Sequence, residues 1–118
     1  MLKVIQELKK KADISVEDFQ QYVVKKYGKF LKTLPGLRSA SVKFVQGGYQ
    51  ITETPIDCCV EMDFRNEETF KKAFESEDAK KILEELNNYV EKSVFLYLKE
   101  KALKKPVVKP AKKAKKKK

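Results

Sequence analysis

Residues 56–64 read Ile-Asp-Cys-Cys-Val-Glu-Met-Asp-Phe, and this stretch decides the fold because its side chains alternate in character along its whole length. Successive side chains of a β-strand point to opposite faces of the sheet, so the alternation predicts a strand that is buried on one face. Pro55 directly precedes the stretch and cannot donate a sheet hydrogen bond, which places the predicted strand start at Ile56. The predicted apolar face consists of Ile56, Cys58, Val60, Met62 and Phe64.

Two helices and a last strand are predicted after this stretch. Asn66 and Ser76 each precede two acidic residues, and both are typical helix N-caps because their side-chain oxygens accept hydrogen bonds from free amides. Apolar residues then recur every three or four positions as far as Tyr89, which predicts helices with one buried side. Residues 94–98, Val-Phe-Leu-Tyr-Leu, favour the extended conformation and predict the last strand.

A long helix is predicted before the alternating stretch. Ser15 opens the sequence SVED, in which the serine caps the helix and Asp18 reaches back to it. The helix ends by Leu34, because Pro35 disfavours helical geometry in the residue before it. Its predicted buried stripe consists of Phe19, Tyr22, Val23, Tyr27, Phe30 and Leu34.

Two further segments complete the pattern. Residues 2–9 and 39–44 alternate in character and predict strands, and Gly47-Gly48 predicts a tight hairpin turn after the second of them. The resulting order, β-α-β-β-α-β, is typical of a ferredoxin-like α+β domain, an antiparallel sheet with helices on one face. The length supports one such domain, residues 1–99, whose other sheet face is either solvated or paired with the sheet of a partner.

Positive charge is concentrated at one end of the sequence. Residues 1–98 contain 16 Lys and Arg and 16 Asp and Glu, whereas residues 99–118 contain 11 lysines and one acid. This composition predicts that residues 100–118 are a disordered segment that contacts nucleic acid or other polyanions without reading sequence, or that only aids solubility. The proposed polyanion-binding residues are Lys112, Lys113, Lys115, Lys116, Lys117 and Lys118.

The sequence lacks residues that several kinds of catalysis and metal binding need. The sequence contains no histidine, the usual base near neutral pH and a common metal ligand. Cys58 and Cys59 are neighbours on one predicted strand and point to opposite faces, so they cannot jointly hold a metal. We expect no metal and no cofactor. Without a signal-peptide core or a run of about 18 apolar residues, a cytoplasmic protein with no membrane contact is expected.

The first helix resembles a known family in three short motifs, FQQY (residues 19–22), YGKFL (residues 27–31) and LPGLR (residues 34–38). They resemble the signature of EthD-like proteins in the dimeric α/β barrel superfamily. The resemblance implies a homodimer whose two sheets pack face to face into a barrel. It also implies a cleft for a small organic molecule between helices and sheet, and, for some members, a role in oxidative or degradative metabolism.

The resemblance also implies where a site would lie. The family's usual tryptophan, histidine and proline fall on Val23, Tyr27 and Lys29, which leaves Tyr27 as a weak catalytic candidate and the polar orienting group. The alternative for Tyr27 is a core aromatic residue with a satisfied hydroxyl. Gly28 costs about 1 kcal/mol relative to alanine in a helix interior, so it marks either close approach of a ligand or a tolerated surface position. The predicted ligand-binding residues are Tyr22, Tyr27, Phe30, Phe44, Val60 and Met62.

Glu61 is a second weak catalytic candidate. It shares a predicted strand face with Asp57, and burial of the two carboxylates at an interface would raise the pKa of at least one of them. The alternative is that both lie on a solvated or interfacial sheet face and help to set the register of a dimer.

The sequence therefore supports two functions of different classes. The first is an EthD-like homodimer that binds a small, mostly apolar organic molecule, with a cofactor-poor oxidation or isomerisation as its reaction. The second is a non-enzymatic dimeric scaffold that binds nucleic acid or other polyanions through two lysine-rich segments, whose joint action strengthens binding. The residues leave open whether the protein is an enzyme.

Overall fold

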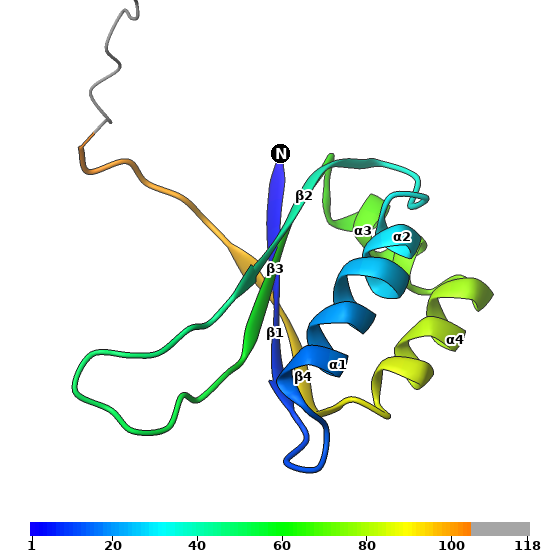
Figure 1. The fold of residues 1–118 in the computed structure, drawn as a ribbon. Helices are drawn as coiled ribbons and strands as arrows, with labels where there is room; N and C mark the ends of the chain where they lie inside the picture. Colours follow the sequence, from blue (N-terminus) through cyan, green and yellow to red (C-terminus); the bar gives the residue numbers. More distant parts are fainter. Residues whose placement is uncertain (105–118) are drawn as a thin grey trace, which may run out of the picture.

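Four strands and two helical segments follow one another in the order β-α-β-β-α-β within residues 1–104, which the computed structural model describes (Figure 1). The strands are β1 (Leu2–Lys10), β2 (Leu37–Phe44), β3 (Cys58–Phe64) and β4 (Val90–Leu98). The helical segments contain α1 (Val16–Gln21), η1 (Tyr22–Tyr27) and α2 (Gly28–Leu31), and then α3 (Glu67–Phe74) and α4 (Glu77–Leu86). The predicted disordered segment falls mostly, and its six named lysines entirely, outside the described residues.

The strands form one antiparallel sheet in the order β2-β3-β1-β4. β1 lies inside the sheet and pairs with both β3 and β4, so that Val4 lies opposite Met62 and Gln6 lies opposite Phe95. All helices cover the same face of the sheet (Figure 1). This arrangement confirms the predicted ferredoxin-like α+β fold.

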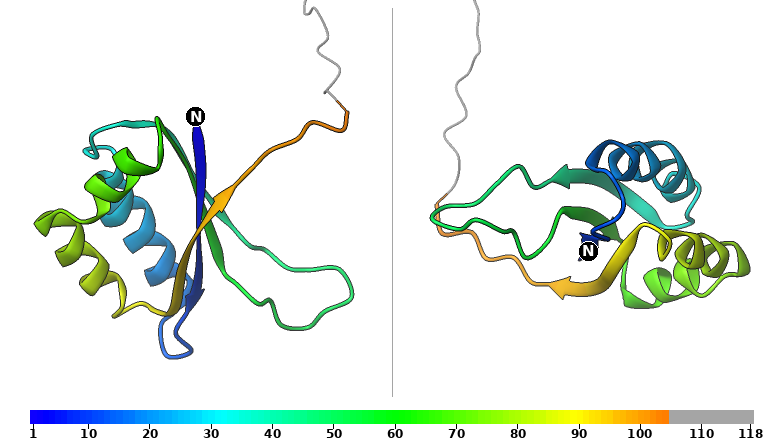
Figure 2. Two further views of the ribbon diagram at one scale, coloured as in Figure 1. Left: turned by 180° about the vertical axis from the view of Figure 1, so that it is seen from behind. Right: turned by 60° about the horizontal axis from the view of Figure 1, so that its bottom comes forward.

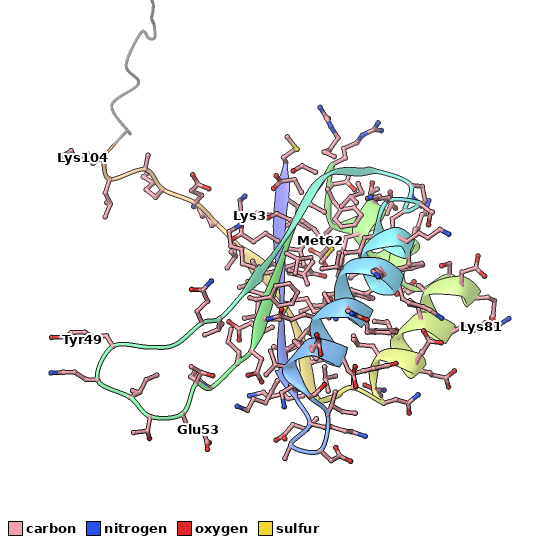
Figure 3. The ribbon with its side chains drawn as sticks, viewed as in Figure 1. Lys3, Tyr49, Glu53, Met62, Lys81 and Lys104 are labelled. Carbon is pink, nitrogen blue, oxygen red and sulfur yellow. The ribbon has the colours of Figure 1, made fainter. Side chains whose placement is uncertain are left out.

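The core lies between the sheet and the helices, and β3 supplies its centre. The predicted alternation is confirmed, because Cys58, Val60, Met62 and Phe64 are all buried while the residues between them lie on the other face. Figure 3 shows Met62 between the sheet and the first helix. Cys58 and Cys59 are free thiols on opposite faces of the strand.

The three predicted N-caps are confirmed. The side chains of Ser15, Asn66 and Ser76 each accept a hydrogen bond from the amide three residues further on, at 3.1, 2.8 and 3.2 Å. Each cap satisfies one of the amides that a helix start leaves without a partner, and the acidic residues that follow suit the helix dipole. The caps therefore set where these helices begin.

The first helix is continuous but not uniformly α-helical. Its middle turn, η1, is a π-helix, and the amide of Gly28 donates to the carbonyl of Val23, five residues back. Sequence periodicity predicts a regular α-helix over these residues, and the structure differs from that prediction by this wider π turn. The physical reason is that Tyr22 and Tyr27 are five residues apart, so the π turn keeps both on the buried side of the helix.

The predicted tight turn at Gly47-Gly48 is wrong. β2 ends at Phe44 and β3 begins only at Cys58, so residues 45–57 form a long loop (Figure 1). Its base is held by backbone hydrogen bonds from Asp57 to Leu8 at 2.8 Å and from Val45 to Asp57 at 2.9 Å. The regular strand β3 therefore begins two residues after the predicted start at Ile56.

The other face of the sheet is uncovered and divided in character. Its β1 and β4 half carries Ile5, Val94, Leu96 and Leu98 beside the charged Lys3 and Glu7, whereas its β2 and β3 half carries ion pairs such as Lys43–Glu61 at 3.2 Å. Figure 2 shows that the 45–57 loop and residues 99–104 both project on the side away from the helices. Figure 3 places Tyr49 and Glu53 in the outer part of this loop. The uncovered face therefore lies between two projecting segments.

None of the helices in residues 1–104 combines the length and the apolar character that crossing a membrane requires.

Candidate functional site

A buried chain of hydrogen bonds links the first helix to two strands. The hydroxyl of Tyr27 in η1 donates to Oε1 of Gln6 in β1, and Nε2 of Gln6 donates to Oγ of Ser93 in β4 at 2.9 Å. Tyr27 and Gln6 are both fully buried. Sequence analysis missed Gln6 and Ser93 as site residues, although a glutamine on the apolar face of the first strand was a usable signal.

The environment of Tyr27 makes it a hydrogen-bond donor and not a base. Burial raises the pKa of its hydroxyl above the usual range, and the hydrogen bond to Gln6 opposes that effect only in part. The phenol therefore keeps its proton near neutral pH. Because Gln6 already accepts that proton's hydrogen bond, the position of Tyr27 matches the core-aromatic alternative.

The predicted ligand-binding residues lie in or against the core between the helices and the sheet, where they pack against one another or against other core side chains. Val60 and Met62 are fully buried. Phe30 makes an edge contact with Phe74, and Phe44 makes one with Phe19, at ring-centre distances of 6.3 and 6.2 Å. Neither of the two cavities beside the first helix is lined by Tyr27, Phe30, Phe44, Val60 or Met62.

The first of these cavities, which we call the Gly28 cavity, lies between the first helix and β2. Its volume is about 230 Å³, and most of its lining is aliphatic or lacks a side chain. A Cβ atom at Gly28 would meet only the Val23 carbonyl, at 3.2 Å. The lining residues are Val24, Gly28, Leu31, Lys32, Ala40, Ser41 and Val42.

The second cavity, which we call the Tyr22 groove, is open and lies between the first helix and the end of α4. Its volume is about 680 Å³. The rings of Tyr22 and Tyr89 stack there with centres 4.1 Å apart and planes 15° apart. The two cavities share no lining residue. The groove is lined by Ile14, Asp18, Gln21, Tyr22, Lys25, Lys26, Glu85, Asn88 and Tyr89.

The hydroxyl of Tyr22 is buried and has no hydrogen-bond partner in the structure. Burial and the nearby Glu85 carboxylate raise the pKa of this hydroxyl above its usual range, although no hydrogen bond joins the two groups here. Tyr22 therefore keeps its proton near neutral pH, and although the residue lines the groove, its hydroxyl is shielded from it. The predicted contact of Tyr22 with a ligand would therefore be made on the α4 side of the helix.

The carboxylates on the uncovered sheet side are partnered separately. Glu61 pairs with Lys43 at 3.2 Å, whereas Asp57 accepts a hydrogen bond from the Lys10 amide at 2.7 Å and lies 3.7 Å from the Lys9 ammonium. This arrangement favours the structural reading of Glu61 over a catalytic pair. Within residues 1–104 no three His, Cys, Asp or Glu side chains gather in a way that could hold a metal ion.

The sheet topology and the two cavities define a ferredoxin-like domain with open space along its first helix. The model of the EthD domain family matches residues 11–93, and the chain belongs to this family. The match confirms the resemblance that the motifs of the first helix indicate. No curated protein matches the chain.

Solved structures of similar fold come from several organisms. An ethyl tert-butyl ether D family protein from Bacillus halodurans is 16% identical, with a TM-score of 0.70 over 86% of this chain and 100% of that chain. A dimeric ferredoxin-like protein of unknown function from Thermobifida fusca is 15% identical, with a TM-score of 0.67 over 82% and 88%. A cofactor-independent oxygenase from Streptomyces nogalater is 10% identical, with a TM-score of 0.64 over 88% and 97%. These likenesses show the fold.

Proposed function

We propose that this EthD-domain protein binds a small, mostly apolar organic molecule between its first helix and the sheet, in the Gly28 cavity. One observation carries the proposal, namely a glycine within a helix beside a space with a largely aliphatic lining. Alanine would favour the helix by about 1 kcal/mol, so the missing side chain has a cost that access for a ligand would explain.

The cavity size limits the ligand. At about 230 Å³ the Gly28 cavity is below the roughly 300–1,000 Å³ usual for ligand sites, which suits a molecule no larger than one substituted ring. Of the six ligand-binding residues predicted from the sequence, Tyr22 lines the Tyr22 groove, and the other five line neither cavity. We therefore propose the Gly28 cavity as the ligand site in their place, with Val24, Leu31 and Val42 as the main apolar contacts.

The family context supports a cofactor-free oxidation or isomerisation, because one structural neighbour is described as a cofactor-independent oxygenase. The residues of this chain support binding more directly than proton abstraction. The sequence has no histidine, and burial raises the pKa of both Tyr22 and Tyr27, so neither tyrosine supplies a base near neutral pH.

Filling the Gly28 cavity tests this proposal. Ala40→Leu places a larger side chain in the cavity from the sheet side, so toluene is expected to bind at least about tenfold more weakly. Amide chemical shifts in a toluene titration measure binding, and those of Gly28, Leu31 and Val42 are expected to move in the unmodified protein. Ala102→Leu makes the same change at an exposed position and is the control. Undiminished toluene binding by Ala40→Leu would show that the cavity is not the site.

We also propose that two copies assemble through the uncovered sheet faces into a dimeric α/β barrel. Leu96 and Leu98 support this assembly, because they are 42% and 40% exposed on that face and sit beside Ile5 and Val94. Structural neighbours from Thermobifida fusca and Bacteroides fragilis are described as dimeric. The 45–57 loop and residues 99–104 would flank the second sheet.

A second candidate function, a dimeric scaffold that binds nucleic acid or other polyanions, is favoured by the charge segregation. Removing residues 105–118 is expected to abolish salt-sensitive binding to duplex DNA while the thermal unfolding midpoint stays unchanged. Glutamine at all six lysines from Lys112 to Lys118 keeps the length and is expected to have the same effect. Fluorescence anisotropy at several salt concentrations measures binding, and retention by both variants would rule the function out.

A further inference from the structure

Within residues 1–104, Lys32 is the one charged residue that lines the Gly28 cavity. It follows α2 directly and is exposed. In the described part of the chain its ammonium has neither an ion pair nor a hydrogen bond, unlike the ammonium groups of Lys9 and Lys43. The ammonium is therefore available to a group that enters the cavity.

The two elements that border the cavity carry only positive charge. Residues 19–52 include the second half of the first helix and all of β2, and they contain six Lys and Arg and no Asp or Glu. Glu61 of the neighbouring strand β3 lies on the uncovered sheet face and is paired with Lys43 at 3.2 Å. Charges of one sign beside a cavity attract a ligand of the opposite sign, so the local field favours an anion.

The sheet wall of the cavity adds backbone donors. β2 is an edge strand, so its outer edge presents amides that have no partner in the sheet. Three successive residues of β2, Ala40, Ser41 and Val42, line the cavity. Because backbone groups alternate in direction along a strand, at least one of these three amides points away from β3. Charged acceptors such as carboxylates form strong hydrogen bonds with backbone amides.

The cavity divides into an apolar interior and a charged rim. Leu31 is almost fully buried and Lys32 is exposed, so an anionic group beside Lys32 keeps part of its hydration while the rest of the ligand contacts aliphatic side chains. This division avoids the large cost of burying an unpaired charge. A single ammonium balances one negative charge, which matches a carboxylate better than a doubly charged phosphate.

We propose that the Gly28 cavity selects a one-ring carboxylate, such as an aromatic acid, and that Lys32 determines this specificity by pairing with the carboxylate. The inference rests on the proposed function and names the class of ligand for the same cavity. The ring lies against Val24, Leu31 and Val42, and the carboxylate lies between Lys32 and the open edge of β2.

Three probes of similar size test the ligand class. Benzoate carries the ring and the carboxylate, benzamide replaces the charge by a neutral amide, and toluene has only the ring. The amide chemical shifts of Gly28, Leu31 and Val42 report binding at the cavity. Benzoate is expected to bind about fivefold more tightly than benzamide at low salt, and added salt is expected to reduce this preference.

Two substitutions separate Lys32 from the general positive charge. Lys32→Gln is expected to remove the preference for benzoate and to leave toluene binding unchanged, whereas Lys32→Arg keeps the charge and is expected to retain the preference. Lys26→Gln is the matched control, because it removes the same charge from the same helix at a residue outside the cavity lining. It is expected to keep the preference.

The outcomes distinguish this inference from the proposed function. Toluene shifts at the three amides, without a preference for benzoate that depends on Lys32, would overturn the inference and leave the apolar site in place. No shift with any of the three probes would overturn both. A cation also suits the end of a helix, so thermal unfolding of Lys32→Gln is measured too. A lower midpoint with an unchanged benzoate preference would mean that Lys32 is only structural, and the inference would be wrong.

Discussion

Replacing Gln6 by leucine is expected to lower the free energy of unfolding by about 2 kcal/mol, because the substitution removes the hydrogen-bond acceptor of a buried hydroxyl. Gln6 accepts from Tyr27 and donates to Ser93. Ser93 is half-buried and can turn toward water, whereas Tyr27 is fully buried and cannot. Urea unfolding followed by circular dichroism measures the change, and a shifted midpoint with an unchanged slope is expected.

A double-mutant cycle separates the lost hydrogen bond from altered packing. Tyr27→Phe removes the donor, so Gln6→Leu combined with Tyr27→Phe is expected to cost about 1 kcal/mol less than the sum of the single changes. Gln46→Leu makes the same chemical change as Gln6→Leu in the exposed loop and is expected to stay within about 0.5 kcal/mol of the unmodified protein. Strictly additive costs would mean that Gln6 and Tyr27 are not bonded.

Leu96→Asp is expected to convert the proposed dimer into a monomer at micromolar concentration. Leu96 lies on the uncovered sheet face opposite Ile5, at the centre of its apolar half. A twofold interface contains the same patch from both copies, so one substitution buries two unpaired charges. The dissociation constant is expected to rise at least about 100-fold, since removing a central anchor costs 2 kcal/mol or more per copy.

Sedimentation velocity at several concentrations measures this change. Val16→Asp places the same charge on an exposed residue of α1, where an acid suits the helix start, and is expected to leave the dimer intact. Thermal unfolding of both variants at low concentration shows whether the domain itself survives. A monomeric unmodified protein, or a dimeric Leu96→Asp variant, would contradict assembly through this sheet face.

Much of the fold could be predicted because its signals are local. The alternation in β3 and the caps at Asn66 and Ser76 depend on neighbouring residues, and all appear where predicted. The hairpin turn could not be predicted in this way. Gly47 and Gly48 permit a tight turn, but the bond from the Asp57 amide to the Leu8 carbonyl joins distant segments and helps decide where β3 begins.

The candidate site could be predicted only in part. Regular helical spacing assigns Tyr22 and Tyr27 to one cleft, and both are indeed on the buried side of the helix. Their partners come from different elements, Gln6 of β1 for Tyr27 and Tyr89 after α4 for Tyr22. Gly28 was recognisable from sequence as unusual, whereas the aliphatic side chains opposite it on β2 were not, because a cavity depends on packing between layers.

The sequence by itself determined the order of the elements, the buried faces of the strands and helices, and the starts of the helices, because periodicity and capping act over a few residues. The tertiary structure alone decided that the hydroxyl of Tyr27 has a hydrogen-bond partner in the sheet. Gln6 and Ser93 are 87 residues apart in the chain and meet only because β1 pairs with β4. That pairing completes the hydrogen-bond chain beneath Tyr27, whereas Tyr22 packs on the opposite side of the helix against Tyr89.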